Sequence, residues 1–348
     1  MTTTTTIITS TPTILSASSP PLPSSSISPH KENNDNNNYG IETELVYFSR
    51  DEKFLHEKPY TTAFAVDHIP GARVDNHEFE RSVVRVRPLS RCHQRRNRLS
   101  DHVDDDDDGG EKLSRNYEMT KGLEPRLDTH GFTFVRAETA LERADFDDPS
   151  IVATRYYAEL AALLKREFPH YRKVAFFDNV VRKRVPLYPS AKGAPATAAQ
   201  PFRYAHVDFT AHGATLKLEN ALGEDLLRQR LEMKCDVINI WRLLNDRPTR
   251  DWPLAFCDWR TVDPADDLIA NDVVYQRGLG ESCFLQRNPG HHWWYLPDQQ
   301  PDEVAVFRNV RVDDENFARG FHCAFFNPLA TPEDAMRESI EVRLAAFY

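Results

Sequence analysis

The stretch CDVINIWRLL (235–244) is the first of a series of short apolar runs that decide the fold. Each run is rich in β-branched and aromatic residues, and Pro, Asp, Gly or Asn separates it from the next. The later runs are LAFCDWR (254–260), ESCFLQR (281–287), HHWWYLP (291–297), EVAVFRNV (303–310), FHCAFFNP (321–328) and SIEVRLAAFY (339–348). Short strands at this spacing are typical of an antiparallel β-sandwich or barrel. We therefore expect a mainly β fold in this part of the chain.

Helices flank the predicted strands. The segment FDDPSIVATRYYAELAALLKREFP (146–169) has Asp147 or Asp148 at a capping position and Pro149 in the first turn. Its apolar residues recur at spacings of three to five and form one stripe, which consists of Ile151, Tyr156, Leu160, Leu163 and Leu164. A second helix is expected at about 222–234. The expected class is thus mainly β with flanking helices.

Two segments differ in composition from the rest of the chain. Residues 1–41 are rich in Thr, Ser, Pro and Asn, so they bury too little apolar surface to order themselves. Residues of about 82–115 carry a basic stretch followed by an acidic one. We interpret this second segment as a solvated insertion rather than a regulatory arm. Residues 42–348 then form a single domain.

Composition excludes several kinds of partner. The chain has 43 Lys and Arg against 53 Asp and Glu, and a net charge of −10 disfavours nucleic acid. No apolar stretch is long enough to span a membrane. The five cysteines are odd in number, widely spaced and without a CxxC pair, which argues against a disulfide framework or a cysteine zinc site. We expect a cytoplasmic protein with a small-molecule substrate. The sequence does not define its oligomeric state.

The motif His206-Val207-Asp208 carries the strongest chemical signal. On a strand, residues two apart face the same side, so the imidazole and the carboxylate converge while Val207 points away. Two such ligands are part of the 2-His-1-carboxylate triad, which leaves open positions on Fe(II) for an oxoacid and O₂. The third ligand must come from elsewhere, and the residues alone leave His212, His291, His292 and His322 as candidates.

The last predicted strand supplies a possible anchor for a cosubstrate. Polar and apolar residues alternate from Arg337 to Arg343, so Arg337, Ser339, Glu341 and Arg343 share one face. An arginine with a hydroxyl two residues further on is suited to a carboxylate. The alternative interpretation is an ordinary solvent-facing strand surface.

Several segments, in order along the chain, resemble the asaB-type hydroxylase/desaturase family, which is related to gibberellin desaturases of fungal secondary metabolism. They are EKPY (57–60), DTHGFTFV (128–135), VAFFDNVVRKRVP (174–186), YAHVDFT (204–210), INIWRLL (238–244), DWPLAFCD (251–258), PDEVAVF (301–307), FHCAFFNP (321–328) and RESIEVRLAAFY (337–348). The resemblance runs from about Tyr47 to the C-terminus.

This resemblance implies a double-stranded β-helix (jelly-roll) core, Fe(II), and 2-oxoglutarate and O₂ as cosubstrates. It implies that His206, Asp208 and His322 are the catalytic metal ligands. It further implies Arg337, Ser339 and, less directly, Arg343 as cosubstrate contacts. Asn239, Trp241 and Arg242 lie in a segment that resembles a pocket-forming motif of the family.

The implied activity is hydroxylation or desaturation of a small secondary metabolite. Two other functions remain open. The same triad with zinc would suit a metal-dependent hydrolase, and a jelly roll that has lost catalysis would be a binding protein.

Overall fold

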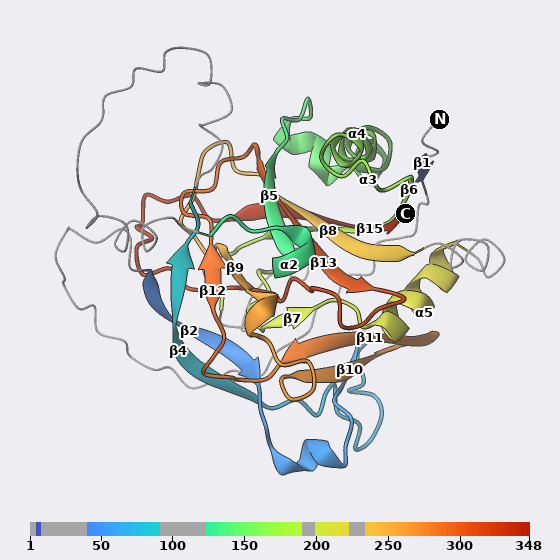
Figure 1. Cartoon of the computed structure of the whole chain (residues 1–348). Helices are drawn as coiled ribbons and strands as arrows, with labels where there is room; N and C mark the ends of the chain where they lie inside the picture. The colour runs from blue at the N-terminus through green and yellow to red at the C-terminus, as the bar shows by residue number, and fades with distance from the viewer. Residues whose placement is uncertain (1–4, 8–39, 91–122, 190–198, 223–233) are drawn as a thin grey trace, which may run out of the picture.

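The computed structural model describes residues 5–7, 40–90, 123–189, 199–222 and 234–348. Strands dominate these residues and form two sheets that curl toward each other (Figure 1). The curled sheets confirm the predicted mainly β class with a jelly-roll core. No helix among the described residues is long and apolar enough to cross a bilayer. The cytoplasmic location stays a prediction.

The first sheet has six strands in the order β1-β6-β15-β8-β13-β5. Their bounds are β1 (Thr5–Ile7), β6 (Lys173–Lys183), β15 (Glu338–Phe347), β8 (Cys235–Leu243), β13 (Glu303–Arg311) and β5 (Phe132–Arg136). All pairs from β6 to β5 are antiparallel, and every residue of β8 and β13 is buried. Strand β15, the last element of the chain, therefore lies inside the sheet between β6 and β8.

The second sheet has nine strands in the order β2-β4-β12-β9-β14-β7-β11-β10-β3. Their bounds are β2 (Ile41–Phe48), β4 (Phe79–Pro88), β12 (Trp293–Tyr295), β9 (Leu254–Cys257), β14 (His322–Ala324), β7 (His206–Val207), β11 (Gly278–Leu285), β10 (Leu268–Tyr275) and β3 (Tyr60–Thr62). Because β2 and β4 join strands that lie near the end of the chain, the N-terminal part is built into the same sheet.

A helical layer covers the outer face of the six-stranded sheet (Figure 1). It consists of α3 (Pro149–Ile151), a π-helical segment (Val152–Tyr156) and α4 (Tyr157–Glu167). Asp148 caps its start by accepting from the backbone N–H of Ser150, and Pro149 occupies the first turn, as predicted. Tyr156, Leu160, Leu163 and Leu164 pack against Ile340 and Val342 of β15. Apolar burial therefore holds the layer in place.

The remaining helical pieces are short. Helix α2 (Leu127–His130) ends at Gly131, and α5 (Ala211–Leu222) follows β7. Single 3₁₀ turns occur at Glu52–Leu55, Arg143–Asp147 and Trp259–Thr261.

Several sequence-based predictions of the organisation need comment. The helix expected at about 222–234 lies outside the described residues, which end at Leu222 and resume at residue 234. The irregular segment expected at 82–115 overlaps β4, which extends to Pro88 because residues 79–86 pair with β2 and residues 86–88 pair with β12; residues 91–115 are not described. Within the tail predicted to be disordered, residues 5–7 form β1 beside β6. The rest of that tail, up to residue 39, is not described.

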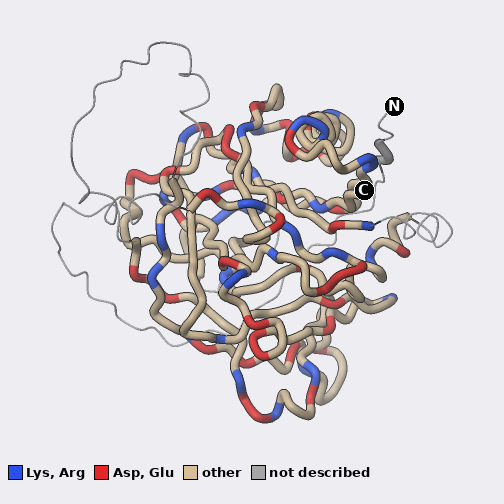
Figure 2. The backbone as a smooth tube through the Cα atoms, in the orientation of Figure 1, with Lys and Arg blue, Asp and Glu red and all other residues tan. Residues whose placement is uncertain are grey.

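Side chains of both sheets meet inside the curl. Phe132, Trp241, Phe256, Phe307 and Ala324 form one buried cluster between the sheets. In the view of Figure 2, Lys and Arg positions are interspersed with Asp and Glu positions, and the basic positions do not form a continuous face. The interior near β7, β14 and β15 is the exception to the apolar filling, because polar side chains gather there.

Candidate active site

His206 and His322 lie directly opposite each other in the pair formed by β7 and β14. Their ring centroids are 4.4 Å apart, and both residues are buried. Phe202 packs edge-on against the ring of His206, and Phe307 packs against that of His322. The two imidazoles therefore share one apolar environment although they are far apart in the sequence.

Backbone carbonyl groups set the tautomer of both histidines. Nδ1 of His206 donates to the carbonyl of Tyr204 at 2.8 Å, and Nδ1 of His322 donates to that of Gly320 at 3.1 Å. Because a carbonyl oxygen only accepts, each Nδ1 carries a proton, so in the neutral ring the lone pair is on Nε2. Burial also lowers the pKa of His322 well below its usual value. A neutral ring held in this way is suited to metal ligation.

Asp208 lies beside the two rings, with Oδ1 3.4 Å from Nε2 of His206. Its other oxygen, Oδ2, accepts from Nδ2 of Asn239 at 2.6 Å and from Nε of Arg343 at 2.9 Å. Burial alone would raise the pKa of Asp208, but Arg343 and the histidines hold it well below the usual range. Asp208 is therefore a carboxylate with one oxygen secured and the other directed at His206.

Asn309 completes the support of Asp208. Its Oδ1 accepts from the backbone N–H of Asp208 at 2.9 Å, and its Nδ2 donates to Oδ1 of Asn239 at 2.6 Å. Asn239 and Asn309 lie on the neighbouring strands β8 and β13, so the six-stranded sheet fixes the position of a ligand candidate on the other sheet.

Arg343 does not face a free carboxylate site. Besides Asp208, its guanidinium contacts Glu341 at 2.6 Å and Asp178 at 3.5 Å. These carboxylates raise the pKa of Arg343 despite its burial. The prediction of Arg343 as a cosubstrate contact therefore does not agree with the structure, because its donors are already engaged.

Arg337 and Ser339 differ from Arg343 in this respect. Both are about 1% exposed, and Nε of Arg337 and Oγ of Ser339 have no hydrogen-bond partner among the described residues. Nη1 of Arg337 donates to the carbonyl of Trp252. Burial lowers the pKa of Arg337 to about 10, because few opposite charges compensate for its desolvation. Unpaired buried donors of this kind are suited to an incoming carboxylate.

One cavity joins the histidines to Arg337. It is lined by Arg182, Phe202, His206, Trp241, Leu254, His322, Arg337 and Glu341. Its volume is about 10 Å³, room for about one water molecule, so a bound dicarboxylate requires neighbouring side chains to shift.

The donor set has the chemistry of a 2-His-1-carboxylate iron site: two neutral imidazole nitrogens and one carboxylate oxygen. As they stand, no three His, Cys, Asp or Glu side chains of the described chain are grouped as around a metal ion. The three side chains therefore match an iron site in the type of donor atom and in their location. Metal binding requires a small movement of these side chains.

The three predicted pocket residues of β8 do not all lie on the same face of the sheet. Asn239 contacts Asp208, and Trp241 lines the cavity with its ring 5.6 Å from the guanidinium of Arg337. Arg242 points to the opposite face, because neighbouring residues of a strand alternate. Its guanidinium donates to Tyr156 and to the carbonyls of Pro301 and Ala137. Arg242 therefore faces away from Asn239 and Trp241, on the side of the helical layer.

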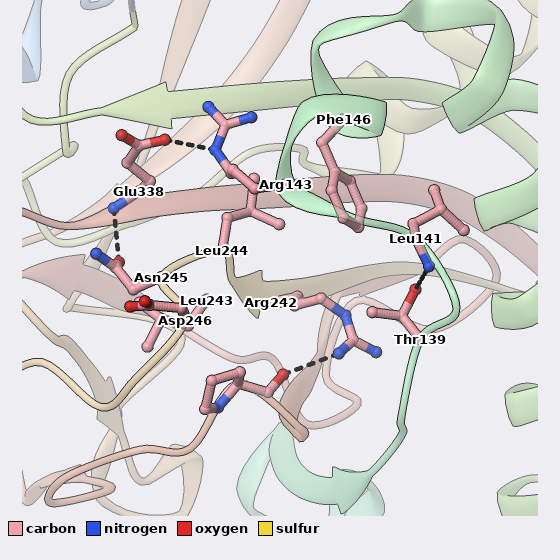
Figure 3. Close-up of a pocket in the computed structure, with 11 residues that line it drawn as sticks. Thr139, Leu141, Arg143, Phe146, Arg242, Leu243, Leu244, Asn245, Asp246 and Glu338 are labelled. Carbon is pink, nitrogen blue, oxygen red and sulfur yellow. Dashed lines mark hydrogen bonds and ion pairs between the residues drawn. The ribbon is translucent and has the colours of Figure 1, made fainter.

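Arg242 instead lines a larger cavity on the side of the helical layer. Figure 3 shows it with Arg143, Phe146, Leu244 and Glu338. The volume is about 450 Å³. None of the proposed metal ligands lines it, so the larger cavity is not the reaction site.

The other candidate histidines lie elsewhere. Nε2 of His291 donates to Oδ2 of Asp267 at 2.9 Å, and its ring stacks on Tyr47. His292 is exposed, and His212 is exposed in helix α5. The structure thus brings only His322, of the four downstream candidates, to His206 and Asp208.

The sequence pattern singles out neither Asn309 nor Arg182, which lie near the site, and it indicates Glu341 only as a member of the polar face of β15. Asn309 had a weak signal, as an amide inside the apolar run EVAVFRNV. Glu341 shares the face of Arg337 and lies 3.9 Å from Nε2 of His322. Arg182 is directly opposite Ser339 in the pairing of β6 with β15. Only the cross-strand register reveals the position of Arg182.

Comparison with known proteins agrees with this geometry. Residues 115–347 match the family described as "Oxidoreductase/YMDC permease-like domain". The chain is 35% identical over 225 residues to the Fe(II)/2-oxoglutarate-dependent dioxygenase nvfI of Aspergillus novofumigatus, covering 64% of this chain and 77% of that protein. It is 31% identical over 243 residues to the hydroxylase/desaturase efuI of Hormonema carpetanum, covering 64% and 78%.

Solved structures indicate the same class of enzyme as the sequence relatives. The iron and alpha-ketoglutarate-dependent endoperoxidase NvfI superposes with a TM-score of 0.67 at 26% identity, covering 89% of this chain and 98% of that one. The chain therefore belongs to a family of Fe(II)/2-oxoglutarate-dependent dioxygenases, enzymes with a jelly-roll core that require Fe(II), 2-oxoglutarate and O₂.

Proposed function

We propose that His206, Asp208 and His322 hold Fe(II), and that Arg337 and Ser339 bind the far carboxylate of 2-oxoglutarate. The observation that carries this proposal is the pairing of His206 with His322 in one cavity with Arg337. Both histidines present Nε2, and Arg337 lacks a carboxylate partner within ion-pair distance among the described residues.

Each residue has a distinct task. His206 and His322 donate neutral nitrogens, held in orientation by backbone carbonyls. Asp208 supplies one oxygen while Asn239 and Arg343 retain the other. Arg337 and Ser339 orient the cosubstrate so that its 2-oxo acid end faces the histidines. The surrounding Phe202, Phe256 and Phe307 keep bulk water away from the reacting atoms.

Bound Fe(II), together with 2-oxoglutarate and O₂, supplies the oxidation of an unactivated C–H bond. We propose that the product is a hydroxylated or desaturated small molecule, as the name of the efuI relative states for that protein. The NvfI relative is named an endoperoxidase, so members with a similar fold differ in outcome. The residues around the substrate, more than the ligands, then select the product.

We also propose that residues 42–348 act as one oxygenase domain. Strands β2 and β4 pair with each other, and β4 pairs with β12, which joins the N-terminal part to the sheet that holds His206 and His322. Separation of the N-terminal strands would expose the edge of that sheet.

The proposal is tested by succinate formation from 2-oxoglutarate in the presence of Fe(II) and O₂, together with Fe(II) binding under anaerobic conditions. The variants His206→Ala, Asp208→Ala and His322→Ala should each lose both properties. His291→Gln is the matched control, because His291 is a buried histidine bonded to Asp267 rather than to the site.

Two results would contradict the proposal. If His322→Ala formed succinate at the wild-type rate, His322 would not be a metal ligand. An active zinc form that needs neither O₂ nor 2-oxoglutarate would make the protein a hydrolase instead.

A further inference from the structure

A second guanidinium faces the proposed cosubstrate pocket. Arg182 on β6 is the direct cross-strand partner of Ser339 on β15, and paired residues of a sheet point to the same face. Arg182 also lines the cavity that contains both histidines and Arg337. Arg182 and Arg337 therefore line the same cavity, and Ser339 shares their face of the sheet.

Arg182 has few protein partners. Its Nη1 donates to the carbonyl of Gln200 at 2.9 Å, and no carboxylate of the described residues lies within ion-pair distance of it. Burial lowers the pKa of Arg182. Burial also lowers the pKa of Arg337, and the nearby Arg182 adds to this effect while Tyr188 opposes it. Two guanidinium groups that line one cavity without a carboxylate in ion-pair distance among the described residues form an incomplete arrangement, which an anion between them would stabilise.

A third orphan donor lies nearby. Oη of Tyr188 is buried without a hydrogen-bond partner among the described residues. Its ring packs edge-on against Trp252, whose carbonyl receives Nη1 of Arg337. Tyr188 also raises the pKa of both Arg182 and Arg337, so its unpartnered Oη belongs to a residue near both guanidinium groups.

We propose that Arg182 is a second anchor for the far carboxylate of 2-oxoglutarate, acting together with Arg337 and Ser339. This inference rests on the proposed function. A carboxylate has about four lone-pair positions, so two guanidinium groups and a hydroxyl can bind it together.

The presence of Glu341 gives a reason for two arginines, Arg182 and Arg337, in the proposed cosubstrate pocket. Its carboxylate also lines the cavity and would repel an incoming anion. Arg343 already neutralises Glu341 in part through a contact of 2.6 Å. After burial, Glu341 has the largest influence on Arg182. The positive charge of Arg182 therefore offsets the repulsion between Glu341 and the cosubstrate.

The test compares two ligands on the anaerobic Fe(II) protein. 2-Oxobutyrate retains the chelating 2-oxo acid of 2-oxoglutarate but lacks the far carboxylate. The dissociation constants of both are measured from the absorbance of the Fe(II)–oxoacid chelate, for the wild type, Arg182→Gln, Arg337→Gln and Lys183→Gln. Lys183 is the matched control, because it is the adjacent cation but is exposed and pairs with Glu338.

The expected result is selective. Arg182→Gln should weaken binding of 2-oxoglutarate by about 10- to 100-fold, the usual effect of a lost charge-assisted contact, and change 2-oxobutyrate by less than about twofold. Arg337→Gln should behave likewise, and Lys183→Gln should match the wild type. If Arg182→Gln does not fold, Arg182→Lys decides the question: it should show a smaller but selective loss, because lysine keeps the charge without the planar fork.

Other results overturn the inference. A selective loss in Arg337→Gln but none in the Arg182 variants would refute the role of Arg182 and leave the proposed function intact. Equal weakening of both ligands in the Arg182 variants would show a general structural role. No selective loss in either arginine variant would refute the proposed anchor as well.

Discussion

His206 and His322 face each other across an antiparallel strand pair although 116 positions separate them in the sequence. Nδ1 of His206 also contacts the carbonyl of His322 at 3.1 Å. The backbone of one proposed ligand thereby helps to set the tautomer of the other. Any change that shifts β7 relative to β14 therefore alters both histidines together, and so metal affinity reports on the register of this strand pair.

Arg343 should act on metal affinity through Asp208. In Arg343→Lys, the positive charge remains but the contacts to Asp208, Glu341 and Asp178 cannot all be kept. We expect affinity for Mn(II), used as an oxygen-insensitive probe, to fall by about 10- to 100-fold, the usual cost of losing support for a ligand. Calorimetric titration measures it. Arg260→Lys is the control, because Arg260 is an exposed arginine that pairs with the buried Asp258 rather than with a proposed metal ligand. Affinity equal to that of the wild type would disprove this role.

Asn309 should be coupled energetically to Asn239. Each single change to Ala removes one side of the hydrogen bond of 2.6 Å between their side chains. We expect the double variant to lose less Mn(II) affinity than the sum of the single losses, because the two amides act on Asp208 as one unit. The same titration provides the four affinities of the cycle. Strict additivity would mean that the two amides support Asp208 independently.

Gly131 should be among the least replaceable glycines of the described chain. Its φ is +84°, and a Cβ there would lie 2.1 Å from the backbone of Arg319. Gly131→Ala should reduce the free energy of unfolding by about 2–6 kcal/mol, which combines backbone strain with overpacking. Urea denaturation measures the loss. Gly278→Ala separates the two causes, because Gly278 also has positive φ but nothing lies within 4 Å of its Cβ position. Equal losses in both variants would exclude the steric contribution.

Asp236 should make the folded state sensitive to acid. Its carboxylate is fully buried and pairs with Arg308 at 2.8 Å and with Arg311 at 2.8 Å. Burial would raise the pKa of Asp236, but the two arginines and Tyr171 hold it below the usual 3.8. The unfolded chain therefore binds the proton first as the pH falls. The stabilising contribution of Asp236 is complete above about pH 4 and disappears as the pH falls through the lowered pKa of the folded state.

Asp236→Asn should thus destabilise the protein by about 3–5 kcal/mol at pH 7 and have a flatter stability profile below about pH 4. Denaturation at several pH values measures both effects. Asp298→Asn is the control, since Asp298 forms an exposed pair with Arg250 that contributes at most about 1 kcal/mol. A parallel acid profile in Asp236→Asn would assign the acid sensitivity to other groups.

Trp241 and Arg242 are adjacent in sequence but should have opposite phenotypes. Trp241→Leu should weaken 2-oxoglutarate binding by about 3- to 10-fold, because it removes the ring beside Arg337. Arg242→Met should leave this binding unchanged and cost about 1–3 kcal/mol of stability, because Tyr156 and two carbonyls lose their donor. Cosubstrate titration and thermal denaturation separate the two. If Arg242→Met lost cosubstrate binding, Arg242 would contribute to the pocket, as predicted from the sequence.

The sequence by itself determined the local parts of this protein. Short apolar runs predicted β8 and β13, alternation predicted β15, and the cap at Asp148 with Pro149 predicted the start of the helical layer. The spacing of His206 and Asp208 predicted that both side chains converge, because strand geometry fixes the direction of residues two apart. The ordered resemblance supplied the family, with Fe(II) and 2-oxoglutarate.

Only the tertiary structure decided which distant residues meet. Residues alone left four histidines as the third ligand candidate, and the pairing of β14 with β7 brings His322 to His206. The order of the strands likewise engages Arg343 with carboxylates, leaves Nε of Arg337 without a partner among the described residues and places Arg182 opposite Ser339. The physical reason is that a pattern along one strand fixes which face a side chain occupies. Its neighbours across the sheet depend on register and strand order, which are properties of the whole fold.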